Sequence, residues 1–261
     1  MTENLAENPA KNPAGNLVEN LAERPNGQLG PKYGVDAPGF VASLGAAGAA
    51  AAVAAARWRG ARRGRTGLAL AGAALLGQTG IYLHTTLRGK LNAWERELDG
   101  AGLRGDEQLL DLGCGRGAVL ITAAKRLPTG RAVGVDLWVG KDQSGNRPGT
   151  TLANARAAGV ADRVAVHTAD ITELPFPDAS FDVVTSALVI HNIPVPALRH
   201  RALDEAVRVL RPGGQLLIAD FWPMAADYAR HLGRGTLHPL GPGYWYGGPW
   251  LAVRMLRMVK K

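Results

Sequence analysis

Residues 109–120 read LLDLGCGRGAVL and contain the pattern that decides the fold. An apolar run typical of a buried strand leads into Asp111, and glycines follow at the alternate positions 113, 115 and 117. Glycines allow a tight turn and let the backbone approach a ligand closely. The stretch that follows, residues 117–127, is helix-like. The sequence therefore predicts a strand, a ligand-binding turn and a helix in succession.

The chain from residue 91 onwards alternates short apolar runs with helix-like stretches. Strands are predicted at 107–112, 132–137, 164–168, 181–186 and 215–220, and helices at 117–127, 149–159 and 197–210. This alternation indicates an α/β fold with a doubly wound, mostly parallel sheet and helices on both faces. Ligands of such sheets bind beyond the carboxyl ends of the strands, so the residues that follow each strand are candidate site residues.

Acidic residues stand at three of the predicted strand ends. Asp136 can accept both hydroxyls of a ribose, which suits NAD and S-adenosylmethionine alike. Asp170, followed by Ile171, suits an adenine whose amine meets the carboxylate and whose ring lies on the isoleucine. Asp111 would repel the pyrophosphate that NAD places near the glycines, but it would attract the ammonium group of S-adenosylmethionine. The charges therefore favour S-adenosylmethionine as the cofactor.

Five blocks occur in one order and spacing: LLDLGCGRG, GVDL, TAD, LPFPDASFDVVTSALVIHNI and VLRPGGQLLIADF. Together they resemble the class I S-adenosylmethionine-dependent methyltransferases over residues 103–221. The resemblance implies a seven-stranded sheet with an antiparallel final strand, and residues 236–240 and 250–259 would form the last two strands. It also implies that the cofactor is bound by Asp111, Gly113, Cys114, Gly115, Gly117, Asp136, Leu137, Asp170, Ile171, Ser186, Ala187 and Leu188. As structural alternatives, Gly113 and Gly117 can serve only to turn the chain, and Asp170 can cap a helix.

The acceptor of the methyl group is less well marked. Residues 186–193, SALVIHNI, resemble the small-molecule and quinone branch of the family, and they lack the Asn/Asp-Pro-Pro-aromatic run of enzymes that methylate bases or glutamine. His191 is a candidate general base because histidine titrates near neutral pH, although it can instead bond the backbone at the rim of the cofactor site. The one cysteine, Cys114, lies in the donor loop, where it cannot attack a cytosine, and we predict no metal site.

Two loops are candidates for contact with the acceptor. WVGKDQSGNRPGTT, residues 138–151, is either a lid or acceptor loop or a plain long turn. GPGYWYGGPW, residues 241–250, is densely aromatic. It can line an acceptor site, lie at a membrane interface or pack under the edge of the sheet.

The first ninety residues differ in composition from the rest. Residues 1–32 are predicted to form a disordered tail, since they are rich in Asn, Pro, Glu and Gly. Residues 33–90 are predicted to form a hydrophobic helical hairpin that anchors the protein in a membrane. Its uncharged stretches, 38–56 and 66–87, would span about 29 and 33 Å as helices, close to the thickness of a bilayer core. Small residues would let the helices approach closely, namely Gly67, Ala71, Gly72 and Ala74.

The alternative for this region is a pair of alanine-rich helices packed on a soluble domain. An arginine-rich segment, RWRGARRGR at 57–65, is predicted to be the loop of the hairpin. The positive-inside rule places this loop in the cytoplasm, and both hairpin ends with the domain outside. That conflicts with the use of a cytosolic cofactor, so three alternatives stay open. The hairpin can dip into one leaflet with all its ends inside, the arginine loop can lie outside against the rule, or the segment can lie on the membrane surface. We predict a membrane-associated protein whose catalytic domain, residues 91–261, is cytoplasmic.

Taken together, the patterns indicate an S-adenosylmethionine-dependent methyltransferase that acts on a small molecule. A lipid-like or membrane-partitioned molecule is one candidate acceptor. The net charge of +8 suggests a nucleic-acid methyltransferase as one alternative. The arginines cluster beside the apolar stretches, however, and stacking aromatic residues are not interleaved with them. A second alternative is a non-catalytic scaffold that binds the cofactor. The sequence does not indicate an oligomeric state.

Overall fold

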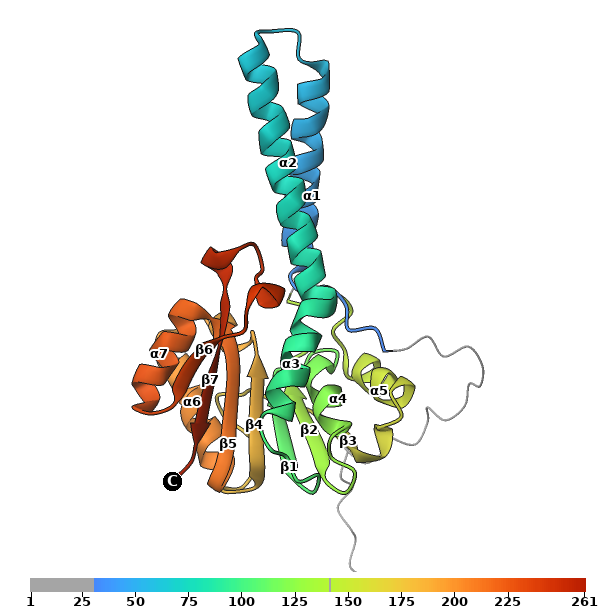
Figure 1. The fold of residues 1–261 in the computed structure, drawn as a ribbon. Coiled ribbons are helices and arrows are strands. Elements are labelled where there is room, and N and C mark those ends of the chain that lie inside the picture. Colours follow the sequence, from blue (N-terminus) through green and yellow to red (C-terminus); the bar gives the residue numbers. More distant parts are fainter. Residues whose placement is uncertain (1–30, 141) are drawn as a thin grey trace, which may run out of the picture.

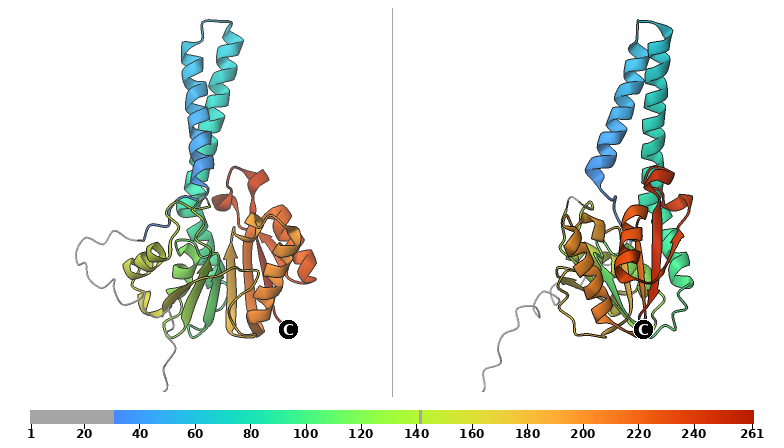
Figure 2. Two further views of the ribbon diagram at one scale, coloured as in Figure 1. Left: turned by 180° about the vertical axis from the view of Figure 1, so that it is seen from behind. Right: turned by 90° about the vertical axis from the view of Figure 1, so that its left-hand side faces the viewer.

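The computed structural model describes residues 31–140 and 142–261. The tail predicted at residues 1–32 therefore lies, except for its last two residues, outside the described residues. The described chain forms an open sheet with helices on both faces, and a long helical hairpin projects from one end of it (Figures 1 and 2). The α/β domain and the hairpin are thus distinct in shape.

Seven strands form one sheet in the order β3-β2-β1-β4-β5-β7-β6. Strands β1 to β5 are parallel, whereas β7 runs antiparallel to both β5 and β6. The predicted fold class and the antiparallel final strand are confirmed. The bounds are β1 Gln108–Leu112, β2 Arg131–Asp136, β3 Val164–Thr168, β4 Phe181–Ala187, β5 Leu210–Phe221, β6 Thr236–Pro239 and β7 Val253–Val259.

Helices cover both faces of the sheet because each strand alternates its apolar side chains between them. Leu109 packs on the face that α3 and α4 cover, and Leu110 packs on the face that α6 and α7 cover. The helices of the domain are α3 Lys90–Asp99, α4 Ala118–Ala124, α5 Pro148–Ala157, α6 Pro196–Val209 and α7 Trp222–Leu232. Because both faces are covered, a ligand can reach the sheet only at the strand ends.

The hairpin consists of α1, Pro38–Arg57, and α2, Arg62–His84. The turn between them is shorter than predicted, since three of the five arginines of the segment already belong to α2. α2 continues through a π-helical turn, Thr85–Gly89, into α3, so that residues 62–99 form one helix. The boundary predicted after residue 90 falls inside this helix. The hairpin and the domain are therefore joined without a linker.

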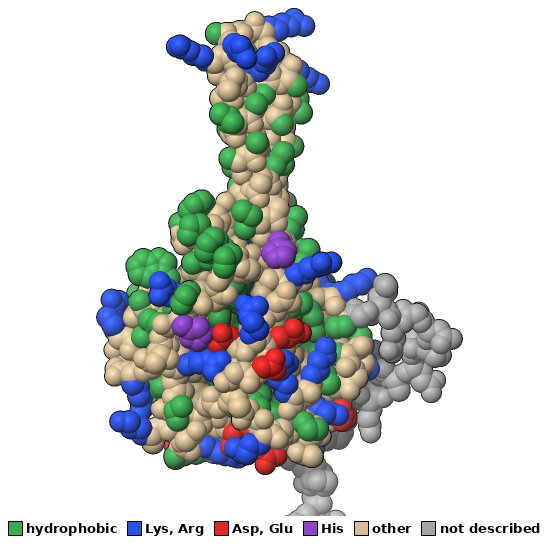
Figure 3. Space-filling model, in the orientation of Figure 1, with side chains coloured by type: hydrophobic (Ala, Val, Ile, Leu, Met, Phe, Trp, Pro, Cys, Tyr) green, Lys and Arg blue, Asp and Glu red, His purple; other side chains and the backbone are tan. Residues whose placement is uncertain are grey.

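Both hairpin helices are long and apolar enough to cross a membrane, by length and composition. Only 17% and 11% of their most apolar stretches are buried in the structure, so the hairpin does not pack on the domain along its length. A side chain at Gly72 would meet the backbone of Gly48 and Ala52, so this glycine lets the two helices approach closely. Gly67, in contrast, has open space around it. Basic side chains gather at the hairpin tip (Figure 3).

The base of the hairpin holds the connection between β6 and β7, residues 240–252. The Thr85 hydroxyl donates to the Trp245 carbonyl at 2.7 Å, and Gln78 Nε2 donates to the Tyr246 carbonyl at 3.3 Å. A side chain at Gly89 would overlap the carbonyl of Gly243. The helix that leaves the hairpin thus fixes the position of a loop far away in the sequence.

We expect Gly89→Ala to destabilise the protein, although alanine is the better helix former by about 1 kcal/mol. The methyl group would collide with a backbone carbonyl, and such overpacking costs roughly 1–3 kcal/mol. Thermal unfolding of the full chain in detergent, followed by circular dichroism, measures the change. Gly149→Ala is the matched control, because this helical glycine has open space around it. A melting temperature of Gly89→Ala equal to or higher than that of the unsubstituted protein would contradict the contact.

Candidate functional site

A cavity of about 630 Å³ lies beyond the carboxyl ends of the strands. Its walls come from the ends of β1, β2, β3 and β4, from the base of the hairpin and from the loop between β6 and β7. A volume of this size is typical of sites for small ligands and cofactors. Of the predicted cofactor-binding residues, the cavity walls contain Asp111, Gly113, Cys114, Gly115, Asp136, Leu137, Asp170, Ile171, Ala187 and Leu188.

The three glycines of the loop after β1 all have left-handed backbones, with φ values of 66°, 51° and 85°. A side chain at Gly113 would overlap Val189, and one at Gly115 would crowd Gln143. Gly117 does not line the cavity but precedes the first residue of α4. The first two glycines therefore lie in the cavity wall, and the third corresponds to the alternative in which a glycine only turns the chain.

Asp111 lies at the bottom of the cavity and is almost completely buried. Its carboxylate accepts hydrogen bonds from the Thr185 hydroxyl at 2.8 Å and from the Leu120 amide at 3.1 Å. Burial raises the pKa of Asp111 to about 7 in spite of these two donors. The carboxyl group is consequently only partly charged at neutral pH, which weakens the electrostatic argument that the sequence suggested for it.

Asp136 follows β2 and organises the loops on either side of the cavity. It accepts hydrogen bonds from the Gly115 amide at 2.8 Å, the Trp138 amide at 2.6 Å and Asn146 Nδ2 at 3.1 Å. The buried Asn146 Oδ1 has no hydrogen-bond partner among the described residues. An acceptor atom therefore stays free beside Asp136, where the sequence predicts the hydroxyls of a ribose.

The ends of β3 and β4 supply further predicted residues. Asp170 Oδ1 accepts from the amide and the hydroxyl of Thr172, both at 2.8 Å, so the carboxylate caps its own turn as well as lining the cavity. Ile171 is buried in the cavity wall. Leu188 lines the cavity with a left-handed backbone, φ 57°. Ser186 is buried but does not line the cavity.

The thiol of Cys114 is buried against β2, where a side chain at Gly134 would overlap it. Burial, together with the nearby carboxylates of Asp111 and Asp136, raises the pKa of this thiol well above its ordinary value. A neutral, buried thiol is a poor nucleophile. Cys114 therefore acts as a small apolar residue in the wall.

His191 lies in the cavity wall after β4. Its Nδ1 atom is 2.8 Å from Oδ1 of Asp220, which is completely buried at the end of β5. Asp220 is itself held by the Tyr228 hydroxyl at 3.1 Å and by the Phe221 amide at 2.8 Å. A carboxylate fixed beside one ring nitrogen can orient an imidazole. The backbone amide of His191 also donates to Asp220 Oδ2 at 3.3 Å, so the geometry is compatible with a general base and with the structural alternative.

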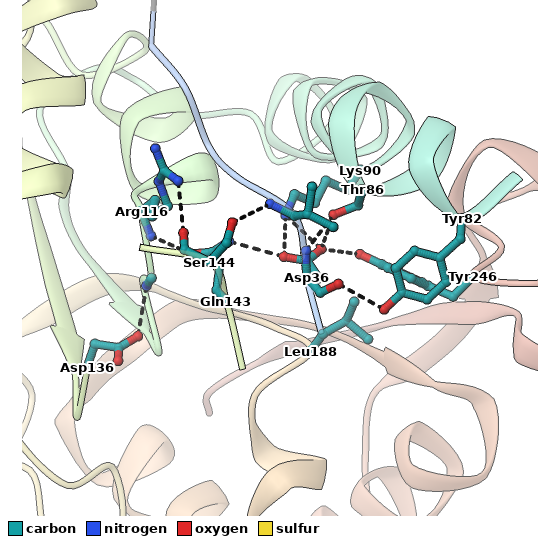
Figure 4. Close-up of polar contacts among 12 residues, drawn as sticks. Asp36, Tyr82, Thr86, Lys90, Arg116, Asp136, Gln143, Ser144, Leu188 and Tyr246 are labelled. Atoms are coloured by element: carbon teal, nitrogen blue, oxygen red, sulfur yellow. Dashed lines mark hydrogen bonds and ion pairs between the residues drawn. The ribbon is translucent and has the colours of Figure 1, made fainter. Parts of the chain in front are cut away.

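The sequence did not indicate a polar cluster at the base of the hairpin, which Figure 4 shows. Lys90 Nζ donates to both carboxylate oxygens of Asp36 at 2.8 Å. The same carboxylate accepts from the Thr86 hydroxyl, the Tyr246 hydroxyl and Gln143 Nε2, at 2.9, 2.7 and 3.1 Å. Burial alone would raise the pKa of Asp36, but Lys90 and the hydrogen bonds hold it below its ordinary value. We call these five residues the Asp36 cluster.

Most of the Asp36 cluster lines the cavity, namely Asp36, Lys90, Gln143 and Tyr246. Gln143 connects it to the donor loop, since Gln143 Oε1 accepts from the Arg116 amide at 2.8 Å. The one signal in the sequence was that Asp36 and Lys90 are charged residues flanking the uncharged stretches. Both predicted loops reach the cavity: Gln143 and Asn146 belong to the first, and the buried Tyr244 and Tyr246 belong to the second.

Comparison with known proteins agrees with this geometry. Residues 110–218 match a family model described as methyltransferase domain. The chain is 38% identical over 146 residues to 27-O-demethylrifamycin SV methyltransferase of Amycolatopsis mediterranei, which covers 52% of this chain and 49% of that protein. It is 36% identical over 127 residues to a ubiquinone/menaquinone biosynthesis C-methyltransferase of Roseobacter denitrificans. This match covers 49% of this chain and 47% of that protein. The chain spans about half the length of these curated relatives.

Among solved structures, geranyl diphosphate C-methyltransferase of Streptomyces coelicolor A3(2) has a similar fold. The TM-score is 0.52 at 18% sequence identity, and the match covers 67% of this chain and 81% of that one. The sheet order and the glycine loop define a Rossmann-like domain of the kind that binds S-adenosylmethionine. The family match over residues 110–218 and these relatives support a class I S-adenosylmethionine-dependent methyltransferase domain in this chain.

Because the pKa of Asp111 is raised in the folded chain, we expect the free energy of unfolding to fall as the pH rises. The folded chain holds this proton up to a pH of about 7, whereas the unfolded chain releases it near 3.8. The stability from this group is therefore full below the lower value and is lost as the pH rises through the upper one. Asp111→Asn cannot ionise, so its unfolding free energy should fall less between pH 5 and 7, by up to about 1.4 kcal/mol per pH unit. Urea unfolding at both pH values measures this, and equal losses in the two proteins would contradict it.

Proposed function

We propose that this protein is a membrane-attached, S-adenosylmethionine-dependent methyltransferase whose acceptor is a small, lipid-like molecule. One observation carries the proposal: a single cavity has the donor loop after β1 at one end and the base of an apolar hairpin at the other. A hairpin anchored in a bilayer would raise the local concentration of an acceptor that partitions into lipid. The relatives named for rifamycin and quinone substrates are consistent with a small-molecule acceptor.

The residues around the donor loop fit the cofactor. When bound, S-adenosylmethionine supplies a methyl group that is already activated on a sulfonium. Asp136 and the unpartnered Asn146 Oδ1 offer acceptors for ribose hydroxyls. Asp170 and Ile171 offer a carboxylate and an apolar surface for the adenine. Because the glycine loop has no side chain at positions 113 and 115, the backbone can lie against the ligand.

Beside the Asp36 cluster, aromatic side chains at the other end of the cavity offer a surface for an apolar acceptor. Tyr82 and Tyr246 meet edge to face at 5.0 Å, and Phe221 lies 6.1 Å from Tyr246 and 5.0 Å from His191, between ring centres. Methyl transfer mainly requires that the two partners are oriented in line. Where the acceptor must lose a proton, we assign its removal to His191, held by Asp220.

The basic charge does not favour a nucleic-acid substrate. Figure 3 shows that the basic side chains of the hairpin tip are separated from the domain by the length of the hairpin. They are Arg57, Arg59, Arg62, Arg63 and Arg65. Five of the basic residues of the chain are thus gathered away from the cavity. A non-catalytic scaffold would bind the cofactor at the same residues, and only an assay of methyl transfer distinguishes it from an enzyme.

The tip arginines bear on orientation. If the hairpin spans the bilayer, its tip and the domain lie on opposite sides, and the positive-inside rule then opposes a cytoplasmic domain. We nevertheless infer a cytoplasmic domain, since the cofactor is cytosolic. Protease added outside sealed, inside-out vesicles tests this. It would cleave a domain on the cytoplasmic side, whereas it would leave a domain on the opposite side intact.

We expect Asp136→Ala to abolish detectable binding of S-adenosylmethionine, because both the ribose acceptor and the anchor of the Gly115 amide are lost. Isothermal titration calorimetry measures the affinity. Asp178→Ala is the control, since this exposed carboxylate pairs with Arg208 away from the cavity. Unchanged affinity of the Asp136 variant would refute the assigned contact.

The methyl transfer itself is tested with labelled S-adenosylmethionine and a whole lysate of cells that lack the gene. We expect label in the organic phase after extraction. Label confined to RNA or protein would contradict the lipid-like acceptor.

We also expect His191→Asn to lower the rate about 10²-fold or more without weakening cofactor binding, as loss of a general base does. An unchanged rate in the variant would remove His191 from the chemistry.

A further inference from the structure

The exposed apolar side chains of this protein are unevenly distributed. Among the residues that the structure describes, fourteen large apolar side chains are exposed. Seven belong to residues 40–87 of the hairpin and its base, and one is Val259. The other six form a set that we call the rim: Leu137, Val139, Val195, Leu198, Trp222 and Trp250.

The topology places the whole rim at the hairpin end of the domain. Leu137 and Val139 follow β2, Val195 and Leu198 follow β4, and Trp222 follows β5, so these residues lie where parallel strands end. Trp250 lies just before β7. Because β7 runs antiparallel to β5, it begins at the end of the sheet where β5 finishes. Val259 is the last residue of β7, so it lies at the opposite end of the strands from the rim. Figure 1 marks this end of the chain with C.

The apolar helices join the domain directly, at the end where the rim lies. α1 begins two residues after Asp36, which lies in the cavity wall. α2 enters the domain as one continuous helix. A hairpin of membrane-spanning length that enters a bilayer therefore brings this end of the domain to the lipid surface. Tryptophan, which accounts for two of the six rim residues, is enriched at that level of a membrane.

The mouth of the cavity opens through the rim. Leu137, Val139 and Leu198 are rim residues and also line the cavity. An apolar surface that is exposed on an isolated chain and continuous with a cavity indicates contact with an apolar partner. Its continuity with the hairpin indicates that this partner is lipid.

We infer that the rim is a membrane-docking surface through which an apolar acceptor passes from the bilayer into the cavity without crossing water. The inference rests on the proposed membrane attachment and extends it, because an anchor alone would leave the domain free of lipid contact. The partner is the surface of a phospholipid bilayer. It is recognised by apolar and tryptophan side chains around the cavity mouth.

Single cysteines that carry an environment-sensitive fluorophore test this in the full-length protein. Leu137→Cys, Trp250→Cys, Leu70→Cys and Val259→Cys are made in a Cys114→Ala background and reconstituted into phosphatidylcholine–phosphatidylglycerol vesicles with brominated acyl chains. Leu137 and Val259 are a matched pair, since they are 56% and 57% exposed. We expect a blue shift and loss of emission at Leu137 and Trp250, and neither change at Val259.

Leu70, in the middle of α2, reports on the anchor separately. Quenching at Leu70 with water-like emission at both rim positions would keep the anchor and overturn the docking surface. If Leu70 also stays unquenched, the membrane attachment itself fails. A blue shift at Leu137 and Trp250 without quenching by the brominated chains would indicate a protein partner or a second copy of the chain, and it would also overturn the inference.

Discussion

The shape of the cavity depends on the ion pair and the hydrogen bonds that the carboxylate of Asp36 makes. This carboxylate joins the segment before α1 to the hairpin base through Lys90 and Thr86, to the loop after β2 through Gln143, and to the loop before β7 through Tyr246. A buried ion pair of this kind adds little to stability by itself, but loss of one partner leaves a buried charge uncompensated and costs roughly 3–5 kcal/mol. The pair therefore specifies which four segments meet.

The same contact links the two ends of the cavity. Gln143 donates to Asp36 and accepts from the amide of Arg116 in the donor loop, and the neighbouring Gly115 amide donates to Asp136. A continuous chain of hydrogen bonds thus leads from the hairpin helix to the carboxylate assigned to the ribose. The position of the hairpin and the conformation of the donor loop are consequently parts of one polar network.

The sequence predicted the sheet well because its signals are local. The apolar runs of β1 to β5 and the glycines after β1 can be read in windows of a few residues, and the carboxyl-end rule then brings Asp136, Asp170 and His191 together. The helix that crosses residue 90 was not predicted, because Arg88, Gly89 and Lys90 interrupt the apolar stretch without breaking the helix. The Asp36 cluster was not predicted either, since no local pattern connects residues that tertiary packing alone brings together.

The bond between Asp36 and Tyr246 spans 210 residues of sequence. During synthesis the hairpin emerges well before the loop that carries Tyr244 and Tyr246. Until then, Lys90 and Asp36 can pair, but one wall of the cavity is missing. Contacts that close so long a loop also form late in folding, because the entropy of closure must be overcome first. The cavity wall that Tyr246 completes therefore closes only after both segments have been made, and the hairpin is made first.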